Sequence, residues 1–207
     1  MIVAAGWCLA GGVAGLVAHV TAQRLAVVPL AVPAWVAAFL GGVLAPWGVA
    51  QGSGVAMAVV SIALLGVLLA LALVDLTVLR LPDLLTLPLA GSGVAWAVVV
   101  GEPVVPRLIG AVAGYSAIAL LARAYRRWRG REGVGLGDAK LLAAGGAWLG
   151  WQALPLVVLL GCALALSWSG ARVVGRGVAS LAAPLAFGPA LAAGIWIVWC
   201  LRAAGRI

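Results

Sequence analysis

The chain has 207 residues, of which 66% are hydrophobic and only 9% are charged, and its formal net charge is +8. This apolar content exceeds what one soluble core of this length encloses, which excludes a soluble globular protein. The basic residues are spread among hydrophobic segments instead of lining one polar face, so the charge predicts membrane topology and no nucleic-acid partner.

We expect an all-α, polytopic membrane helix bundle of about eight spans, because apolar runs of roughly 17–25 residues are long enough to cross a bilayer. The first span has no basic residue before it, so we expect it to be retained and not cleaved as a signal peptide. The sixth span is short, so it is tilted, re-entrant or part of a broken helix buried in protein. We treat residues 1–207 as a single integral membrane domain. The expected spans are residues 3–21, 33–50, 54–75, 84–101, 107–123, 139–151, 153–171 and 183–201.

The distribution of Lys and Arg orients these spans. With the N-terminus outside, the positive-inside rule is satisfied, because the inner loops hold most of the basic residues. Asp75, Asp83 and Asp138 then all lie at the cytoplasmic boundary, where they are able to meet. The inner basic residues are Arg24, Arg80, Arg123, Arg126, Arg127, Arg129, Arg131, Lys140, Arg172 and Arg176, and the outer ones are Arg107, Arg202 and Arg206.

Excluding the other common catalytic groups leaves the carboxylates as the candidates for catalysis. Cys8, Cys162 and Cys200 lie singly in apolar runs, without the CxxC pairs of a zinc site. The one histidine, His19, has no nucleophile motif to accompany it, so neither a serine nor a cysteine triad is supported. Five carboxylates and one imidazole offer few metal ligands, and no Gly-rich nucleotide motif follows a strand. We therefore expect no metal and no cofactor.

Asp75 and Asp138 are the candidate catalytic pair. Asp75 ends an apolar span, where a carboxylate opposes the negative end of the helix dipole, so a structural role explains it poorly. Asp138 precedes an apolar run, and Lys140 is close enough in the sequence to pair with it, so a helix N-cap explains it as well as catalysis does. Asp83 follows a proline, which favours an N-cap. Two facing carboxylates share a proton, so one acts as base toward water and the other as acid toward a carbonyl oxygen.

Two motifs, which stand in the order that a known family has, carry a resemblance to that family. Residues 135–138 read Gly-Leu-Gly-Asp, and with the segment up to residue 151 they resemble the GxGD region of the prepilin leader peptidases. Those proteins are the membrane aspartyl proteases of type IV pilus and type II secretion systems. Residues 75–88, in which an Asp is followed eight residues later by the Asp of a Pro-Asp pair, resemble the family's other motif. Residues 186–189 read Ala-Phe-Gly-Pro and resemble its PFGP element, with Ala in place of the first Pro.

The resemblance implies a role for each matched residue. Asp75 and Asp138 become the catalytic pair of an aspartic-type endopeptidase. Gly135 and Gly137 supply the backbone freedom that brings the Asp138 loop close to the substrate. Asp83 is implied to be structural or to position the pair. We add Lys140 to the residues expected to support this loop or bind substrate, because it lies close to Asp138.

The resemblance also implies substrates and a location. The substrates are prepilin or pseudopilin precursors, whose short basic leader is cut at the cytoplasmic face just before a hydrophobic helix. The location is the bacterial inner (plasma) membrane. Long members carry a CxxC zinc domain between their first two spans and also N-methylate the product with S-adenosylmethionine. Here about a dozen mostly apolar residues, 21–32, occupy that place. The resemblance therefore does not carry methyltransferase activity over to this chain.

Two alternatives from other classes remain. In a small ion- or proton-coupled transporter, Asp75 and Asp138 would bind protons or a cation, although their position at one boundary and not at the midplane favours the peptidase. In a non-enzymatic assembly subunit, the Gly spacings at 11–15 and 146–150 would pack helices. The Arg-rich segment 123–131, expected to be a loop, is assigned to topology and to contact with anionic membrane lipids.

Overall fold

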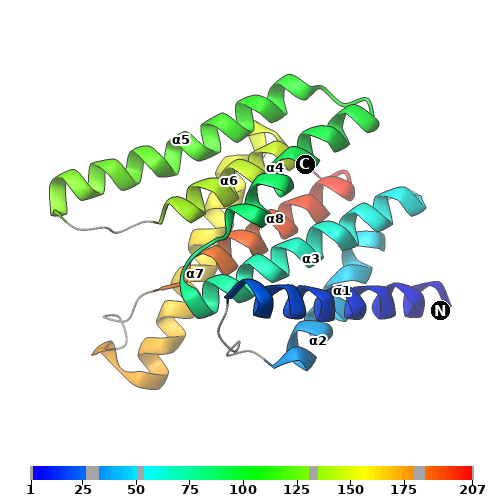
Figure 1. The fold of residues 1–207 in the computed structure, drawn as a ribbon, viewed down its shortest axis with the longest axis horizontal. Helices are drawn as coiled ribbons and strands as arrows, with labels where there is room; N and C mark the ends of the chain where they lie inside the picture. The colour runs from blue at the N-terminus through cyan, green and yellow to red at the C-terminus, as the bar shows by residue number, and fades with distance from the viewer. Residues whose placement is uncertain (1, 27–32, 51–53, 131–134, 180–184, 207) are drawn as a thin grey trace.

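The computed structural model of the chain describes residues 2–26, 33–50, 54–130, 135–179 and 185–206. Within these ranges the secondary structure is helical, which confirms the expected all-α class (Figure 1). A short 3-10 turn, Trp151–Ala153, leads from α6 into α7. The α-helices are α1 Ile2–Ala26, α2 Ala34–Ala50, α3 Val55–Val78, α4 Asp83–Val99, α5 Val104–Arg129, α6 Leu136–Leu149, α7 Leu154–Arg176 and α8 Gly188–Ala203.

Several helices have the length and composition of membrane spans. The segments Val55–Val78, Val104–Arg129 and Trp151–Arg176 are long and apolar enough to cross a bilayer. Their outer faces leave large apolar side chains such as Val112 and Leu166 uncovered, which suits contact with lipid. The chain is therefore a membrane protein.

Two helices refine the sequence expectations. α6 has only 14 residues, about 21 Å at 1.5 Å per residue, so the sixth apolar helix is short, as expected. The expected loop from Arg123 to Arg131 is wrong for residues 123–129, because α5 continues to Arg129, and Arg131 lies outside the described residues. Gly130 ends α5 in the left-handed conformation and donates its N–H to the Arg126 carbonyl oxygen. The arginines of the last turn also stabilise the negative end of the helix dipole.

α6 lies at the centre of the bundle, between α5 and α4 on one side and α8 on the other. α3 packs between α8 and α1, α2 covers α1, and α7 packs on α8. Two indoles join these layers: Trp148 donates to the Leu89 carbonyl oxygen at 2.8 Å and Trp199 to the Ser61 hydroxyl at 3.0 Å. Their rings meet edge to face, with centroids 5.4 Å apart. The core side chains around them include Leu64, Leu68, Leu71, Leu141, Leu142, Leu191 and Ile195.

Glycines allow two helix pairs to approach closely. A Cβ on Gly146 would stand 2.2 Å from the Gly110 carbonyl oxygen, where α6 crosses α5. A Cβ on Gly15 would stand 2.1 Å from the Ala37 carbonyl oxygen, where α1 crosses α2. Backbone contact of this kind is the usual packing of membrane helices, which lack a hydrophobic driving force between them. The glycine spacings therefore serve the fold.

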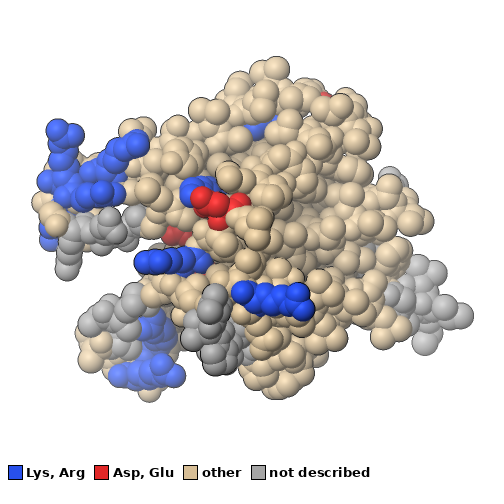
Figure 2. All heavy atoms as spheres, in the orientation of Figure 1, with Lys and Arg blue, Asp and Glu red and all other residues tan. Residues whose placement is uncertain are grey.

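The charged residues divide between the two ends of the bundle. We call one the Asp75 end, which holds the C-terminus of α3 and the N-termini of α4, α6 and α8. The other is the Glu102 end, which holds the C-termini of α4, α6 and α8 and the N-terminus of α5. In Figure 2, most of the visible Lys and Arg atoms lie in the left half of the view, toward the ends of α5 and α7 that belong to the Asp75 end.

Candidate active site

Asp75 lies in the last turn of α3 and is buried, with 5% of its surface exposed. α3 continues three residues beyond the expected end at Asp75, to Val78. The Asp75 carboxylate accepts a hydrogen bond from the backbone N–H of Gly188 at 2.9 Å. Gly188 is the first residue of α8, so the positive end of the α8 dipole faces this carboxylate. A second helix therefore compensates for the unfavourable position of Asp75 in its own helix.

No side chain fits at Gly188 without moving Asp75. A Cβ there would stand 2.7 Å from Asp75 Oδ2 and 2.9 Å from its Cγ. These separations are below any ordinary van der Waals contact, so a substitution must displace either the carboxylate or the start of α8. Because Asp75 is held directly against the α8 backbone, its orientation depends on the residue at position 188.

Asp138 lies in the first turn of α6 and is half-buried. Burial, followed by the nearby charge of Asp75, raises the pKa of Asp138 to about 7. The two aspartates, which are far apart in the sequence, therefore interact at one end of the bundle. The alternative role of Asp138 as an N-cap is wrong, because Gly135 is the N-cap residue and no side chain caps α6.

The glycines before Asp138 leave room for neighbouring groups, and they do not adopt backbone angles that only glycine favours. Neither Gly135 nor Gly137 has a positive φ, so the expected need for conformational freedom is not supported. A Cβ on Gly137 would stand 3.0 Å from the Leu81 Cβ and 3.3 Å from the Leu81 backbone nitrogen. Gly137 thus lets α6 begin directly against the connection between α3 and α4. Gly135 lies next to Asp138, since a Cβ there would be 3.6 Å from Oδ2.

Asp83 and Lys140 form an ion pair, with Nζ and Oδ1 2.5 Å apart. The expected pairing of Lys140 with Asp138 is therefore wrong. The N-cap role of Asp83 is also wrong, because Pro82 is the N-cap residue and makes no side-chain cap. Asp83 is the first residue of α4, from which its side chain reaches across to α6. The pair joins α4 to α6 beside the two aspartates.

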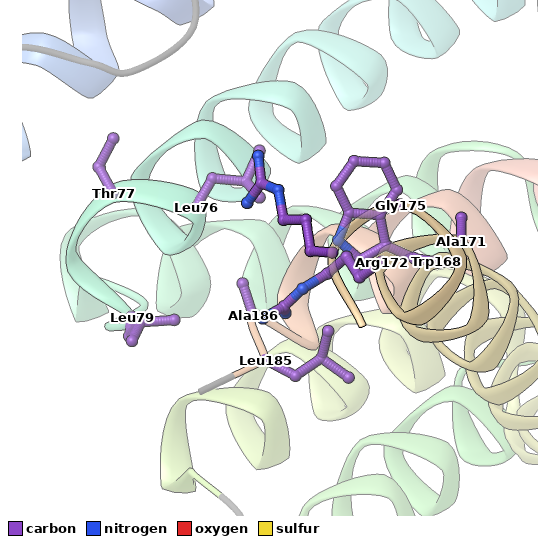
Figure 3. Close-up of a pocket in the computed structure, with 10 residues that line it drawn as sticks. Leu76, Thr77, Leu79, Trp168, Ala171, Arg172, Gly175, Leu185 and Ala186 are labelled. Carbon is purple, nitrogen blue, oxygen red and sulfur yellow. The ribbon is translucent and has the colours of Figure 1, made fainter. Parts of the chain in front are cut away.

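A hollow of about 540 Å³ opens next to Asp75, between the C-terminal ends of α3 and α7 (Figure 3). Its walls come from three segments: the end of α3, the end of α7 and the stretch just before α8. Two arginines line it, and no carboxylate does so among the residues that the structure describes. The lining residues are Leu76, Thr77, Leu79, Trp168, Ala171, Arg172, Gly175, Arg176, Leu185 and Ala186.

The other sequence candidates lie outside this site. His19 is buried in α1, and its Nδ1 has no hydrogen-bond partner within the described part of the chain. Cys8 and Cys162 are exposed and Cys200 is buried, each as a free thiol. Within the described ranges, no three His, Cys, Asp or Glu side chains lie close enough together to hold a metal ion.

Sequence reasoning missed the role of Gly188 and the hollow. The resemblance at the Phe-Gly-Pro element implies no role for its glycine. A Gly-Pro pair opening an apolar helix was the available signal. The hollow had no sequence signal, because its residues come from three segments and Arg172 and Arg176 had been assigned to topology.

Comparison with known sequences identifies the family. The profile of the type IV leader peptidase family matches residues 62–170, a range that includes both Asp75 and Asp138. This match covers more than half of the chain, which therefore belongs to the type IV leader peptidase family. No solved structure matches the chain.

Individual relatives agree with this assignment. The chain is 46% identical over 137 residues to the prepilin leader peptidase/N-methyltransferase of Aeromonas salmonicida, covering 63% of this chain and 45% of the relative. It is 42% identical over 160 residues to the protein of the same name from Burkholderia pseudomallei, covering 76% and 49%. The leader peptidase HopD of Salmonella typhimurium is 43% identical over 113 residues, covering 54% and 73%. The chain thus matches about half the length of the first two relatives.

Proposed function

We propose that this chain is a membrane aspartyl endopeptidase that removes the leader peptide of type IV prepilin or pseudopilin precursors, with Asp75 and Asp138 as its catalytic pair. The observation that carries the proposal is the interaction of two carboxylates from α3 and α6 at one end of the bundle, one held by the Gly188 N–H and the other with a pKa raised to about 7. Perturbed, interacting carboxylates are typical of catalytic sites. Family membership points to the same activity. No observation favours the transporter alternative.

The two aspartates have different tasks in the proposed reaction. The Gly188 N–H stabilises the negative charge on Asp75, which suits it to accept a proton from the attacking water. Asp138 holds its proton near neutral pH and donates it to the scissile carbonyl oxygen. The water oxygen bonds to the carbonyl carbon, which gives a tetrahedral diol. When the C–N bond breaks, Asp75 gives its proton to the leaving amine and Asp138 regains one from a diol hydroxyl, so both return to their starting states.

The proposal includes an orientation in the membrane. The protein is a multi-pass protein of the bacterial inner membrane, with the Asp75 end at the cytoplasmic boundary. The concentration of Lys and Arg toward that end supports this orientation through the positive-inside rule. The arginines in the last turn of α5 then lie where they contact anionic lipid headgroups.

The proposal covers the peptidase step alone. The names of the Aeromonas and Burkholderia relatives include N-methyltransferase, but the matched region is less than half of each relative's length. We therefore attach no methyl transfer to the aspartate pair.

The test is reconstitution of the full chain in liposomes with a candidate precursor, followed by mass analysis of the new N-terminus. We expect a single cut just before the hydrophobic segment. The added mass of a methyl group on the product would report methyl transfer in the same experiment. The Asp138→Asn protein, verified as folded, is the control and leaves the precursor intact. Equal processing by the wild type and this variant would refute the catalytic pair.

A further inference from the structure

The hollow between α3 and α7 lies directly beside the groups that hold Asp75. Leu76 follows Asp75 in the last turn of α3. On the opposite wall, Leu185 and Ala186 lead through Phe187 into Gly188, whose N–H holds the Asp75 carboxylate. Figure 3 shows the end of α3 on one side and the end of α7 on the other, with Leu185 and Ala186 between them. A chain bound in this hollow is therefore adjacent to the backbone that fixes the catalytic carboxylate.

The walls are apolar and incompletely covered. Leu76, Leu79, Trp168 and Leu185 are 44%, 46%, 60% and 39% exposed. Within a membrane, such side chains stabilise a complex through close van der Waals packing against the bound segment. The volume of about 540 Å³ lies within the range of about 300–1,000 Å³ found for ligand sites. The hollow therefore suits an apolar segment of several residues.

The positive charge at the rim of the hollow favours one part of the precursor over the other, the hydrophobic segment over the basic leader. Arg172 and Arg176 lie one turn apart on α7, and among the described residues no Asp or Glu lines the hollow. A basic leader would be repelled by the Arg176 guanidinium group, whereas an apolar segment is not. The hollow therefore fits the part of the precursor that follows the leader.

We propose that this hollow binds the first residues of the precursor's hydrophobic segment, on the carboxyl side of the scissile peptide, so that the peptide bond lies over Asp75 and Asp138. The inference rests on the proposed function and adds the place and polarity of substrate binding.

The first experiment fills the hollow. Ala171 lies on its α7 wall and is exposed, so Ala171→Trp occupies the space without disturbing the core. Val174 is in the same helix, is 90% exposed and does not line the hollow, so Val174→Trp is the matched control. We expect Ala171→Trp to raise KM for the precursor about tenfold with kcat nearly unchanged, the pattern of lost ground-state binding. The control should behave as the wild type. Unchanged KM in a folded Ala171→Trp protein would refute the docking site.

The second experiment locates the bound segment directly. A photoreactive benzoylphenylalanine replaces Ala171 in the Asp138→Asn background, where the precursor stays uncut, and the cross-linked residue is identified by mass spectrometry. We expect the label on the precursor, just after the cleavage point. A cross-link to the leader, or a cross-link only to an anionic phospholipid, would overturn the inference. Because this variant needs no turnover, its result is separate from the proposed function, which fails if the wild type leaves the precursor intact.

Discussion

The two ends of α6 hold charged side chains in opposite ways. At the Glu102 end, Arg107 donates to the Ala147 carbonyl oxygen at 3.4 Å, and Arg202 donates to that of Leu149. Glu102 pairs with Arg107 and lies 3.8 Å from Arg202. These cations satisfy carbonyls that the last turn of a helix leaves without partners, and they face its negative end. At the Asp75 end, the first turn of α6 instead holds a carboxylate beside a second carboxylate.

The charged groups at the Glu102 end stabilise the fold, whereas those of the aspartate pair at the Asp75 end serve catalysis. At the Glu102 end, opposite charges and backbone acceptors satisfy one another, so the arrangement stabilises the folded state. At the Asp75 end, like charges interact and the pKa of Asp138 is raised to about 7, which favours a protonated acid at neutral pH. We therefore expect substitutions at the Asp75 pair to change the rate of cleavage and substitutions at the Glu102 end to change stability.

The largest effect is expected at the aspartates themselves. Asp75→Asn and Asp138→Asn each remove one partner of the acid–base cycle, whose members contribute about 10²–10⁴-fold each to a rate. Processing of the precursor in liposomes should fall by at least about a thousandfold in either variant. The thermal midpoint of each variant serves as the folding control. Near-normal cleavage by either one would remove that aspartate from the site.

Gly188→Ala is expected to have the next largest effect on cleavage. The new methyl group would press on the Asp75 carboxylate, at 2.7 Å from Oδ2, and move it out of line. We expect kcat to fall about 10–100-fold, because a misplacement of about 1 Å has effects of this order. Gly161→Ala is the matched control, since its Cβ would meet ordinary contacts at 3.5 Å on the α7–α8 interface. Equal activity of the two variants would mean that Gly188 does not position Asp75.

The pH dependence tests the protonation state of Asp138. Because this group must carry a proton, cleavage should fall as pH rises through about 7, by about tenfold per unit above it. The same raised pKa makes the folded state hold a proton that the unfolded chain releases above about 4, so stability should decline between pH 4 and 7. Asp138→Asn should abolish that decline in thermal stability. A rate that stays flat to pH 9 contradicts this assignment.

Arg107→Ala tests the other end of α6. The guanidinium is buried, with 3% of the residue exposed, and its loss leaves Glu102 and the Ala147 carbonyl without this partner. We expect the free energy of unfolding to drop by about 1–3 kcal/mol, because the buried Ala147 carbonyl oxygen loses its partner. Cleavage by the protein that remains folded should stay within about twofold of wild type. Arg206→Ala, an exposed arginine at the same end, should change neither quantity. A selective loss of kcat in folded Arg107→Ala would break the division between the two ends.

The sequence predicts much of this arrangement and misses specific parts of it. Apolar run length predicts the helices, since a membrane span is a local property of about 20 residues. The position of Asp75 at a helix C-terminus correctly indicated an unusual carboxylate. Its partner, the Gly188 N–H, comes from a helix far along the chain, and such tertiary contacts have no local signal.

The same limit explains the wrong pairings. Lys140 is two residues from Asp138, so sequence proximity suggested that pair. In a helix, residues two apart point to different sides, which leaves Lys140 free to reach Asp83 on α4. The N-cap prediction for Asp83 failed because Pro82 takes the cap position. Short-range patterns therefore locate the end of a helix more reliably than they identify the partner of a side chain.

The smallest effect is expected at Asp83, which lies at the Asp75 end but belongs to an opposite-charge pair. The Asp83 and Lys140 side chains are 57% and 30% exposed, and partly exposed pairs contribute about 0–1 kcal/mol. Asp83→Asn should therefore lower the thermal midpoint by no more than about 2–4 °C and leave cleavage within about twofold of wild type. Lys140→Met should have a similar effect, and the double variant should be no worse than either single one, because the two changes remove the same contact. Asp83→Ser should not restore stability, since no cap is lost. If folded Asp83→Asn is as inactive as Asp75→Asn, then Asp83 belongs to the catalytic machinery, and an opposite-charge pair at this end serves chemistry as well.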